Sequence, residues 1–161
     1  MMKNIQKGFT LIELIVVIII LSILAATALP KFSGLAADSR AAKMQAMTAS
    51  LKGAATMAHG QLLAEGGKAT SSVTLESGKV INMVHFYPTA SGIVGAIEDS
   101  GNGYVSKVNA LVSTAWDFYP DAGRTNCVVT YYAATTVSGV SSVPVIKDSA
   151  VKGVSAVSNC T

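Results

Sequence analysis

The sequence predicts an α+β protein, with one long N-terminal α-helix packed against an antiparallel β-sheet. Two observations predict this fold. From about residue 9 to residue 65, apolar residues either run continuously or recur every three or four positions, which is the period of a helix. From Ser71 onward, short runs rich in valine, threonine and tyrosine alternate with turn residues, which is the pattern of hairpin strands.

The first half of the predicted helix is an almost unbroken apolar run over residues 9–29. Its 21 residues match the roughly 20 that a helix needs to cross a bilayer. Lys3 and Lys7 precede the run, and basic residues on the N-terminal flank hold that end in the cytoplasm. We therefore expect a single membrane span, after which residues 30–161 are exported.

Glu13 is a carboxylate near the start of this run. A charge in hydrocarbon costs about 2.5–3.5 kcal/mol on insertion scales, so such residues usually face a protein partner or a water-filled cavity. Complementing the positive end of the helix dipole would offset only about 0.3–1 kcal/mol. The sequence therefore predicts a partner for Glu13.

Two processing hypotheses compete at this end of the chain. Ala26-Thr27-Ala28 has the small-x-small pattern of an ordinary secretory cleavage site. However, an apolar region of 21 residues is longer than the roughly 7–15 of a signal peptide, and Glu13 interrupts it. Both departures favour the second hypothesis, in which the chain is cut before the apolar run.

The junction before the run resembles the leader and mature start of type IV prepilins and of the related pseudopilins. Lys7-Gly8 carry the resemblance, together with the hexapeptide Phe9-Thr10-Leu11-Ile12-Glu13-Leu14. It implies that a prepilin peptidase cuts between Gly8 and Phe9 and methylates the new amine of Phe9. The implied parts are a leader peptide (1–8), a transmembrane and filament-core helix (9–29), and an exported globular domain that includes the amphipathic half of the helix (30–161).

The same resemblance implies an assembly role for Phe9 and Glu13. In this family the N-terminal helices stack in a filament core, where the carboxylate neutralises the terminal ammonium of a neighbouring subunit. The chain would then be a structural subunit, held first in the inner membrane with its N-terminus in the cytoplasm and later in an extracellular pilus for surface attachment. The implied partners are further copies of the chain, the prepilin peptidase, the pilus assembly machinery and minor pilins.

Two finer interpretations follow from the rest of the chain. Pro30, the Met- and Ala-rich helix, residues 87–93 and the Cys127 to Cys160 region together resemble major pilins of the mannose-sensitive haemagglutinin type. The alternative is a pseudopilin of a type II secretion system. A C-terminal disulfide loop is commoner in pili, whereas a compact calcium loop would favour the secretion system.

Cys127 and Cys160 are the two cysteines of the chain, without a C-x-x-C motif or a neighbouring histidine. Export favours a disulfide between them, which the chain-entropy model values at about 3–4 kcal/mol for a loop of this length. Two unpaired thiols are the alternative. In pilins a disulfide near the C-terminus commonly closes a variable region exposed on the filament, which this pair resembles.

Beyond Pro30 the predicted helix becomes amphipathic, and Gly66-Gly67 provides its stop. Pro30 lacks a backbone donor and clashes with the preceding turn, so we expect a helix kink there. Some pilins carry a glycine earlier in this segment, where the helix can melt; Ser22 stands there in this chain, which leaves melting open. The predicted apolar face is Met44, Met47, Leu51, Ala54, Ala58 and Leu62.

The strand-rich part is expected to begin with a hairpin and to end with two longer strands. The expected strands are residues 73–75, 80–84, 126–133 and 137–146. Pro144 suits an edge position or a bulge. Between these groups, residues 93–97 and 104–114 are expected to form short helical turns, separated by a turn signal at 101–103.

The sequence has no motif typical of a catalytic, cofactor or metal site, so we expect neither an enzyme nor a bound cofactor or metal ion. His59 and His85 are the two histidines, and neither lies in a catalytic motif; His59 is expected to be a packing or surface residue rather than a ligand. Residues 99–103 lack the alternating acidic ligands of a calcium loop and indicate a plain turn. Residues 116–121 concentrate aromatic area beside two carboxylates, as platforms for sugars or partner proteins do, but core burial is the favoured interpretation.

The charge balance argues against nucleic acid as a partner. Of the twelve basic residues Lys3 and Lys7 leave with the leader, so ten Lys and Arg remain beside nine Asp and Glu. The sequence contains no basic stretch interleaved with aromatic residues, which is the pattern of a surface that binds a phosphate backbone. About 130 residues follow the apolar helix, which is enough for one domain with a single core.

Overall fold

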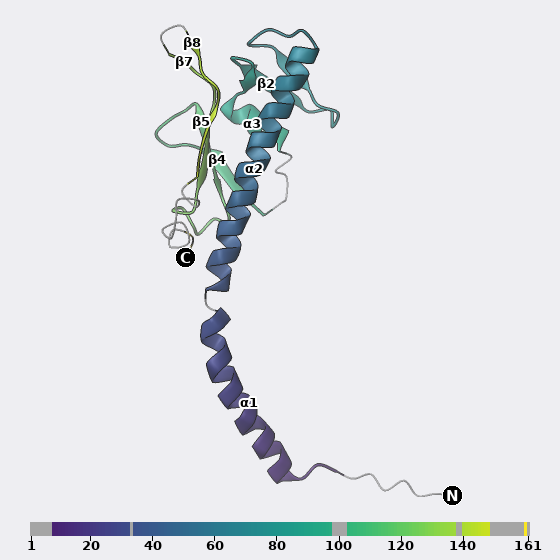
Figure 1. The fold of residues 1–161 in the computed structure, drawn as a ribbon, viewed down its shortest axis with the longest axis vertical. Helices are drawn as coiled ribbons and strands as arrows, with labels where there is room; N and C mark the ends of the chain where they lie inside the picture. The colour runs from purple at the N-terminus through teal and green to yellow at the C-terminus, as the bar shows by residue number, and fades with distance from the viewer. Residues whose placement is uncertain (1–7, 33, 98–102, 138–139, 149–159, 161) are drawn as a thin grey trace, which may run out of the picture. The chain divides into compact units, whose positions relative to one another are not determined.

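The computed structural model describes residues 8–32, 34–97, 103–137, 140–148 and 160, so Lys3 and Lys7 lie outside the described residues (Figure 1). The chain forms two compact units, Met1–Ala36 and Ala37–Thr161. The first unit holds helix α1, Leu11–Phe32, and the first two residues of α2, Leu35–Ala64. The rest of α2 and the other described elements lie in the second unit, and together they confirm the predicted α+β class.

Helix α1 contains no buried residue and consists mainly of leucine, isoleucine, valine and alanine. In lipid a helix satisfies each backbone polar group internally, which outweighs the modest helix propensity of isoleucine and valine. Its hydroxyls are also bonded within the helix, from Ser22 Oγ to the Ile18 carbonyl at 2.6 Å and from Thr27 Oγ1 to the Leu24 carbonyl at 2.9 Å. By length and composition the described chain has one helical stretch that could cross a membrane, and α1 begins it.

The predicted long helix is present as α1 and α2, with Gly34 in a turn before α2. α1 is helical from Ser22 through Pro30 and ends two residues later, at Phe32. The kink at Pro30 stays a prediction.

Helix α2 buries one face, because its apolar residues recur at three- and four-residue spacing. Of the predicted face, five residues are buried and Ala54 is half-buried, while its neighbour Ala55 is buried. The buried residues are Ala37, Ala41, Met44, Met47, Leu51, Ala55, Ala58 and Leu62.

The predicted stop at Gly66-Gly67 is confirmed as a hydrogen-bonded helix end. Gly67 N donates to the Leu62 carbonyl at 2.9 Å and Gly66 N to the Leu63 carbonyl at 3.1 Å, the two bonds of a Schellman motif. Gly66 has a φ of 67°, the left-handed region that glycine enters without steric cost.

Gly66→Ala should therefore lower the free energy of unfolding by about 1–2 kcal/mol, since a side chain is strained in the left-handed region. Gly53→Ala is the matched control, because Gly53 lies inside α2 with no atom within 4 Å of an added Cβ. That control should stabilise the chain by about 0.5–1 kcal/mol through helix propensity. Urea unfolding followed by the fluorescence of Trp116, the single tryptophan, would measure both, and equal effects would contradict the assignment.

Within the described residues the strands form two antiparallel sheets and a separate hairpin. The three-stranded sheet has the order β1 (Ser72–Thr74), β2 (Val80–Val84), β3 (Tyr87–Pro88). The four-stranded sheet has the order β4 (Val105–Val108), β5 (Ala115–Tyr119), β6 (Val129–Tyr132), β9 (Val145–Asp148). The short strands β7 (Thr136–Val137) and β8 (Val140–Ser141) pair with each other.

The first predicted hairpin is confirmed, with Val73 opposite Ile81. Helix α3, Ala90–Ala96, overlaps the predicted helical turn at 93–97 and begins at the N-cap Thr89, whose hydroxyl accepts from Gly92 N at 2.9 Å. Tyr131 and Tyr132 lie on opposite faces of β6, where Tyr131 is fully buried and Tyr132 half-buried.

Two predictions in the strand-rich part are wrong, one of a helical turn and one of a strand. Residues 104–114 are not a helical turn, because Val105–Val108 forms β4 and pairs with Trp116–Tyr119 of β5. That ladder is long-range, so the local pattern could not show it. The single strand expected at 137–146 is divided between the β7–β8 hairpin and β9. Pro144 directly precedes β9, the edge strand of its sheet, where a missing backbone donor costs no ladder bond.

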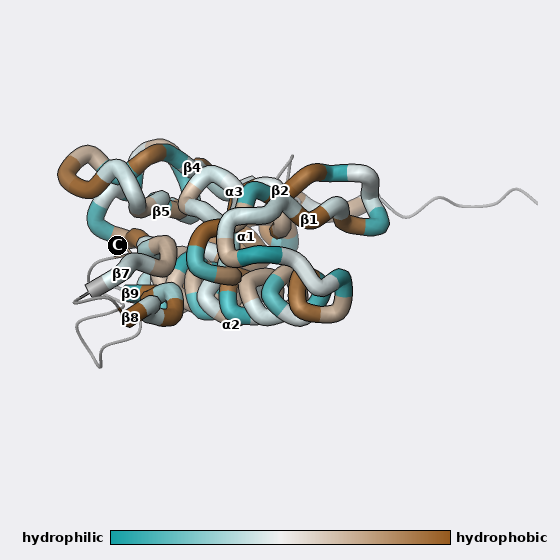
Figure 2. Tube along the Cα trace, turned by 90° about the horizontal axis from the view of Figure 1, so that it is seen from above, coloured by the Kyte–Doolittle hydropathy of each residue, from teal (hydrophilic) through white to brown (hydrophobic). Residues whose placement is uncertain are grey.

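The core of the second unit lies between α2 and the strands. Figure 2 shows β4, β5, α3 and β2 in a layer on one side of α2. The larger cluster includes Met44 and Leu51 of α2 with Phe118, Val129 and Tyr131 of β5 and β6. A smaller cluster joins the end of α2 to β1 and β2, through Ala58, Leu62, Val73, Ile81 and Met83. Each fully buried large side chain contributes about 1.5–3 kcal/mol.

Both histidines serve the tight turn between β2 and β3. His85 and Phe86 have φ values of 49° and 68°, the left-handed pair that a two-residue hairpin turn needs. The ring nitrogens of His85 contact Thr136 Oγ1 at 3.0 Å and Ser141 Oγ at 3.2 Å, which links this turn to the β7–β8 hairpin. His59 Nδ1 lies 2.8 Å from the Phe86 carbonyl oxygen and its ring stacks on Tyr87, so His59 packs, which is one of the two roles expected for it.

Candidate functional site: the start of helix α1

The residues of the predicted cut site lie just before α1 and are accessible. Gly8, Phe9 and Thr10 precede the helix and are exposed, Phe9 by 88%. A Cβ added to Gly8 would meet no atom of the described residues within 4 Å. The packing of the described residues therefore does not require glycine at this position, which leaves recognition by another molecule as a reason for it.

Thr10 and Glu13 form a reciprocal cap on the first turn of α1. Thr10 N and Oγ1 donate to Glu13 Oε2 at 2.9 and 2.8 Å, and Glu13 N donates to Thr10 Oγ1 at 3.3 Å. This capping box satisfies backbone donors that have no partner inside the helix. Thr10 is absent from the predicted site residues, although the Thr-x-x-Glu spacing is the sequence signature of such a cap.

The cap leaves half of the carboxylate available. Both bonds from Thr10 reach Oε2, and Glu13 Oε1 accepts no hydrogen bond from the described residues. Glu13 lies in a shallow groove of about 400 Å³ at the start of α1. The other residues that line this groove are apolar: Phe9, Ile12, Val16 and Val17. An apolar surface that covers this groove would bury a carboxylate oxygen without a partner, which is costly unless a cation is buried with it.

A disulfide is predicted between the two cysteines. Cys127 and Cys160 form this disulfide, with a Cα–Cα distance of 4.7 Å. Both cysteines are fully buried against the larger core cluster. Arg40 of α2 ties this end to the helix, because Nη1 donates to the Cys160 carbonyl at 3.3 Å and Nε pairs with Asp121 Oδ2 at 3.2 Å. The disulfide and Arg40 together fasten the end of the chain to the second unit.

The aromatic run at 116–121 belongs mostly to the core, as expected. Phe118 is fully buried and Tyr119 is 7% exposed, whereas Trp116 is half-buried. Asp117 is buried too, on the opposite face of β5 from Phe118. Its carboxylate accepts hydrogen bonds at 2.7–3.2 Å from three side chains: Asn109 Nδ2, Tyr119 OH and Thr130 Oγ1. These bonds offset the desolvation of a buried charge.

We expect this network to make the stability of the domain sensitive to alkali. Burial, with the neighbouring Asp117 carboxylate, raises the pKa of Tyr119 to about 12, and burial also raises the pKa of Tyr131. An unfolded tyrosine loses its proton near pH 10, so between pH 10 and about 12 ionisation favours the unfolded chain. The stability that neutral Tyr119 contributes is complete below pH 10 and is lost as the pH rises through 12.

We therefore expect the urea midpoint to fall between pH 10 and 12 and to fall less in Tyr119→Phe. At neutral pH the same variant should lose about 1–3 kcal/mol, since Asp117 is left with one donor fewer. Tyr132→Phe is the control, because Tyr132 is half-buried and makes no hydrogen bond to this network. Identical midpoint-against-pH curves for Tyr119→Phe and the parent chain would contradict the expectation.

The described residues contain no group of three side chains able to hold a metal ion. Asp121 is paired with Arg40, Asp117 is enclosed by its donors, and Asp148 accepts from Thr48 Oγ1 at 2.8 Å. Most of the turn at 99–103 lies outside the described residues.

Comparison with curated proteins finds a type IV major fimbrial protein FimA of Dichelobacter nodosus. It is 32% identical over 140 residues, which cover 87% of this chain and 76% of the relative. The chain belongs to the type IV pilin family. Fimbrial protein EcpC of Eikenella corrodens is 34% identical over 123 residues, 73% of this pilin and 80% of the relative. The family described as prokaryotic N-terminal methylation motif matches residues 3–29, and no solved structure matches significantly.

Membership makes this pilin a structural subunit of a type IV pilus, anchored in a membrane as a precursor and extracellular in the pilus. The matched relatives are structural fimbrial proteins. They give no support to the alternative of a secretion pseudopilin, and the resemblance to the mannose-sensitive haemagglutinin type stays a prediction.

Proposed function

We propose that a prepilin peptidase cuts this pilin behind Gly8 and methylates Phe9, and that the mature chain then polymerises through α1 into a filament used for surface attachment. Before the cut, α1 spans the inner membrane once with its N-terminus in the cytoplasm. The assembly machinery and minor pilins are the further partners. The observation that carries the proposal is the carboxylate of Glu13, which lies among apolar residues and has one oxygen, Oε1, that accepts no hydrogen bond from the described residues.

Cleavage behind Gly8 would create a terminal ammonium, the cation that Glu13 lacks as a partner. The new ammonium would be on Phe9, which lines the same groove as Glu13. When α1 of a neighbouring subunit covers this groove, its Phe9 ammonium can bond Glu13 Oε1, while Thr10 continues to hold Oε2. The attraction between the two charges rises as water leaves, which offsets part of their desolvation. Before cleavage no such cation exists at Phe9, so the cut prepares assembly.

Deletion of the gene for this pilin, followed by electron microscopy and by an assay of attachment to a surface, tests the proposal. We expect long filaments and attachment to be lost together and to return when the chain is supplied again. Mass spectrometry of the assembled protein should show a chain that begins at methylated Phe9. Intact filaments with blocked protein export would instead indicate the secretion pseudopilin, and a chain beginning at Leu29 would indicate ordinary signal cleavage.

A further inference from the structure

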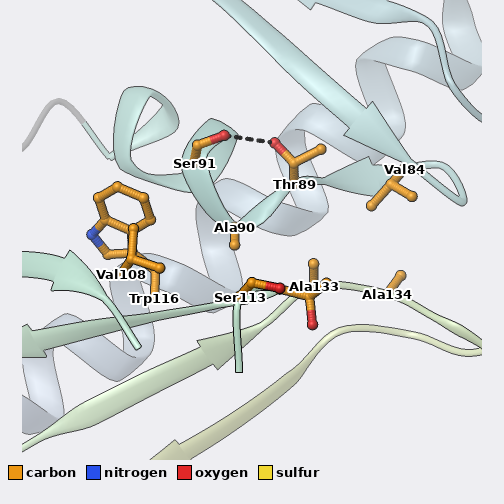
Figure 3. Close-up of a pocket in the computed structure, with 10 residues that line it drawn as sticks. Val84, Thr89, Ala90, Ser91, Val108, Ser113, Trp116, Ala133 and Ala134 are labelled. Atoms are coloured by element: carbon orange, nitrogen blue, oxygen red, sulfur yellow. Dashed lines mark hydrogen bonds between the residues drawn. The ribbon is translucent and has the colours of Figure 1, made fainter. Parts of the chain in front are cut away.

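The second unit contains a cavity that polymerisation through α1 does not use. Its volume is about 370 Å³. On one side lie the end of β2 and the start of α3, and on the other lie β4, β5, the loop before β5 and the two residues that follow β6. Figure 3 shows Trp116 and Val108 at one end, Val84 at the other, and Thr89 and Ser91 across from Ser113 and Ala133. The lining residues are Val84, Thr89, Ala90, Ser91, Val108, Ser113, Thr114, Trp116, Ala133 and Ala134.

Hydroxyl groups and the ring of one indole line this cavity. Ser113 and Thr114 are exposed, and their hydroxyls make no hydrogen bond to a described residue. Thr89 Oγ1 and Ser91 Oγ lie 3.3 Å apart, and one of them donates to the other. Figure 3 shows the nitrogen of the Trp116 indole on the side away from the other lining residues, so the carbon part of the ring borders the cavity. Hydroxyls and an indole ring therefore border one small, otherwise apolar space.

The loop that carries two of these hydroxyls is held rigidly. Asn109 Nδ2 donates to both oxygens of buried Asp117, at 3.0 and 2.9 Å, and Asn109 Oδ1 accepts from the backbone amides of Leu111 and Val112 at 2.9 and 3.0 Å. Ser113 and Thr114 follow directly, and the Ala133 amide donates to the Thr114 carbonyl at 3.0 Å. Because the loop is ordered before any ligand arrives, binding has little ordering entropy to overcome.

The lining selects the chemistry of a ligand. No lining residue carries a charge, so a charged ligand would lose its hydration without a counter-ion. A wholly apolar ligand would displace water from the hydroxyls of Ser113 and Thr114 without replacing its hydrogen bonds. We propose that the cavity binds a neutral sugar ring, with a C–H face against the Trp116 indole and ring hydroxyls bonded to Ser113 and Thr114. The volume of the cavity lies near the lower end of the range for small-molecule sites, which suits a ligand of one such ring.

The single tryptophan makes this binding directly measurable, because emission from the chain reports Trp116 alone. The full chain would be purified in a detergent without a sugar headgroup and titrated with methyl glucoside and methyl galactoside, with N-acetylneuraminic acid as the charged comparison. We expect a saturable change in emission for at least one neutral glycoside, with a dissociation constant on the order of 1–10 mM, and weaker binding of the acidic sugar.

Two variants and a control assign the signal to the cavity. Ala134→Leu fills it and should abolish the saturable change. Ser113→Ala with Thr114→Val alters exposed residues, should leave the fold intact, and should weaken binding about tenfold. Val143→Leu, an exposed position outside the lining, should bind like the parent chain.

No saturable change with either neutral glycoside would overturn the proposal, and so would unchanged affinity in the Ser113→Ala, Thr114→Val chain. The titration uses unassembled protein, so its failure would leave polymerisation through α1 untouched. Loss of filaments in turn would not alter the titration.

Discussion

Glu13→Ala should leave cleavage behind Gly8 normal and should reduce the yield of filaments about tenfold or more, because a buried ammonium without its partner costs about 3–5 kcal/mol. We expect the cut site to be unaffected, since Gly8 and Phe9 precede α1 and make no hydrogen bond to the Glu13 carboxylate. Mass spectrometry of the N-terminus would measure cleavage, and immunoblots of sheared filaments would measure assembly.

Glu13→Gln separates pairing from capping. Glutamine can still accept the two hydrogen bonds from Thr10, so the capping box of α1 is retained while the charge is removed. If the charge is what assembly needs, Glu13→Gln should lose filaments as completely as Glu13→Ala. Thr10→Val is the reverse control, because it removes the hydroxyl of the cap and keeps the carboxylate. Normal filaments from Glu13→Gln would contradict the pairing and would assign Glu13 to the cap alone.

Replacing both cysteines with serine should lower the free energy of unfolding by about 3–4 kcal/mol, the stabilisation expected for a crosslink that closes a loop of this length. The disulfide joins positions 33 residues apart, so its removal frees the end of the chain in the unfolded state. In the folded state, removal of the disulfide would also loosen the backbone at position 160, where the carbonyl of Cys160 in the parent chain accepts a hydrogen bond from Arg40. Urea unfolding followed by Trp116 emission would measure the change.

Reduction provides the matched control for this variant. The parent chain in a strong reductant should unfold at nearly the urea concentration of the Cys127→Ser, Cys160→Ser chain, and the reductant should not shift the variant. A variant as stable as the oxidised parent would show that the buried contacts of the two cysteines, rather than the crosslink, hold this end.

The sequence by itself determined the features that depend on local spacing and composition. The apolar run at 9–29 predicts α1, the apolar period beyond Pro30 predicts the buried face of α2, and Gly66-Gly67 predicts the helix end. The motif at Gly8 to Leu14 predicts the family, which the relatives show. These signals are readable because helices and caps are fixed by residues at most four positions apart.

Only the tertiary structure decided what depends on distant residues. Val105–Val108 becomes a strand because β5 lies beside it, and Pro144 separates the β7–β8 hairpin from β9 in the segment that the local pattern made one strand. The donors of Asp117 come from β5, β6 and Asn109, and the cavity beside Trp116 is lined from several elements. Long-range strand pairing and convergence on a cavity leave no periodic trace in one sequence, because each contact joins residues whose separation the chain does not repeat.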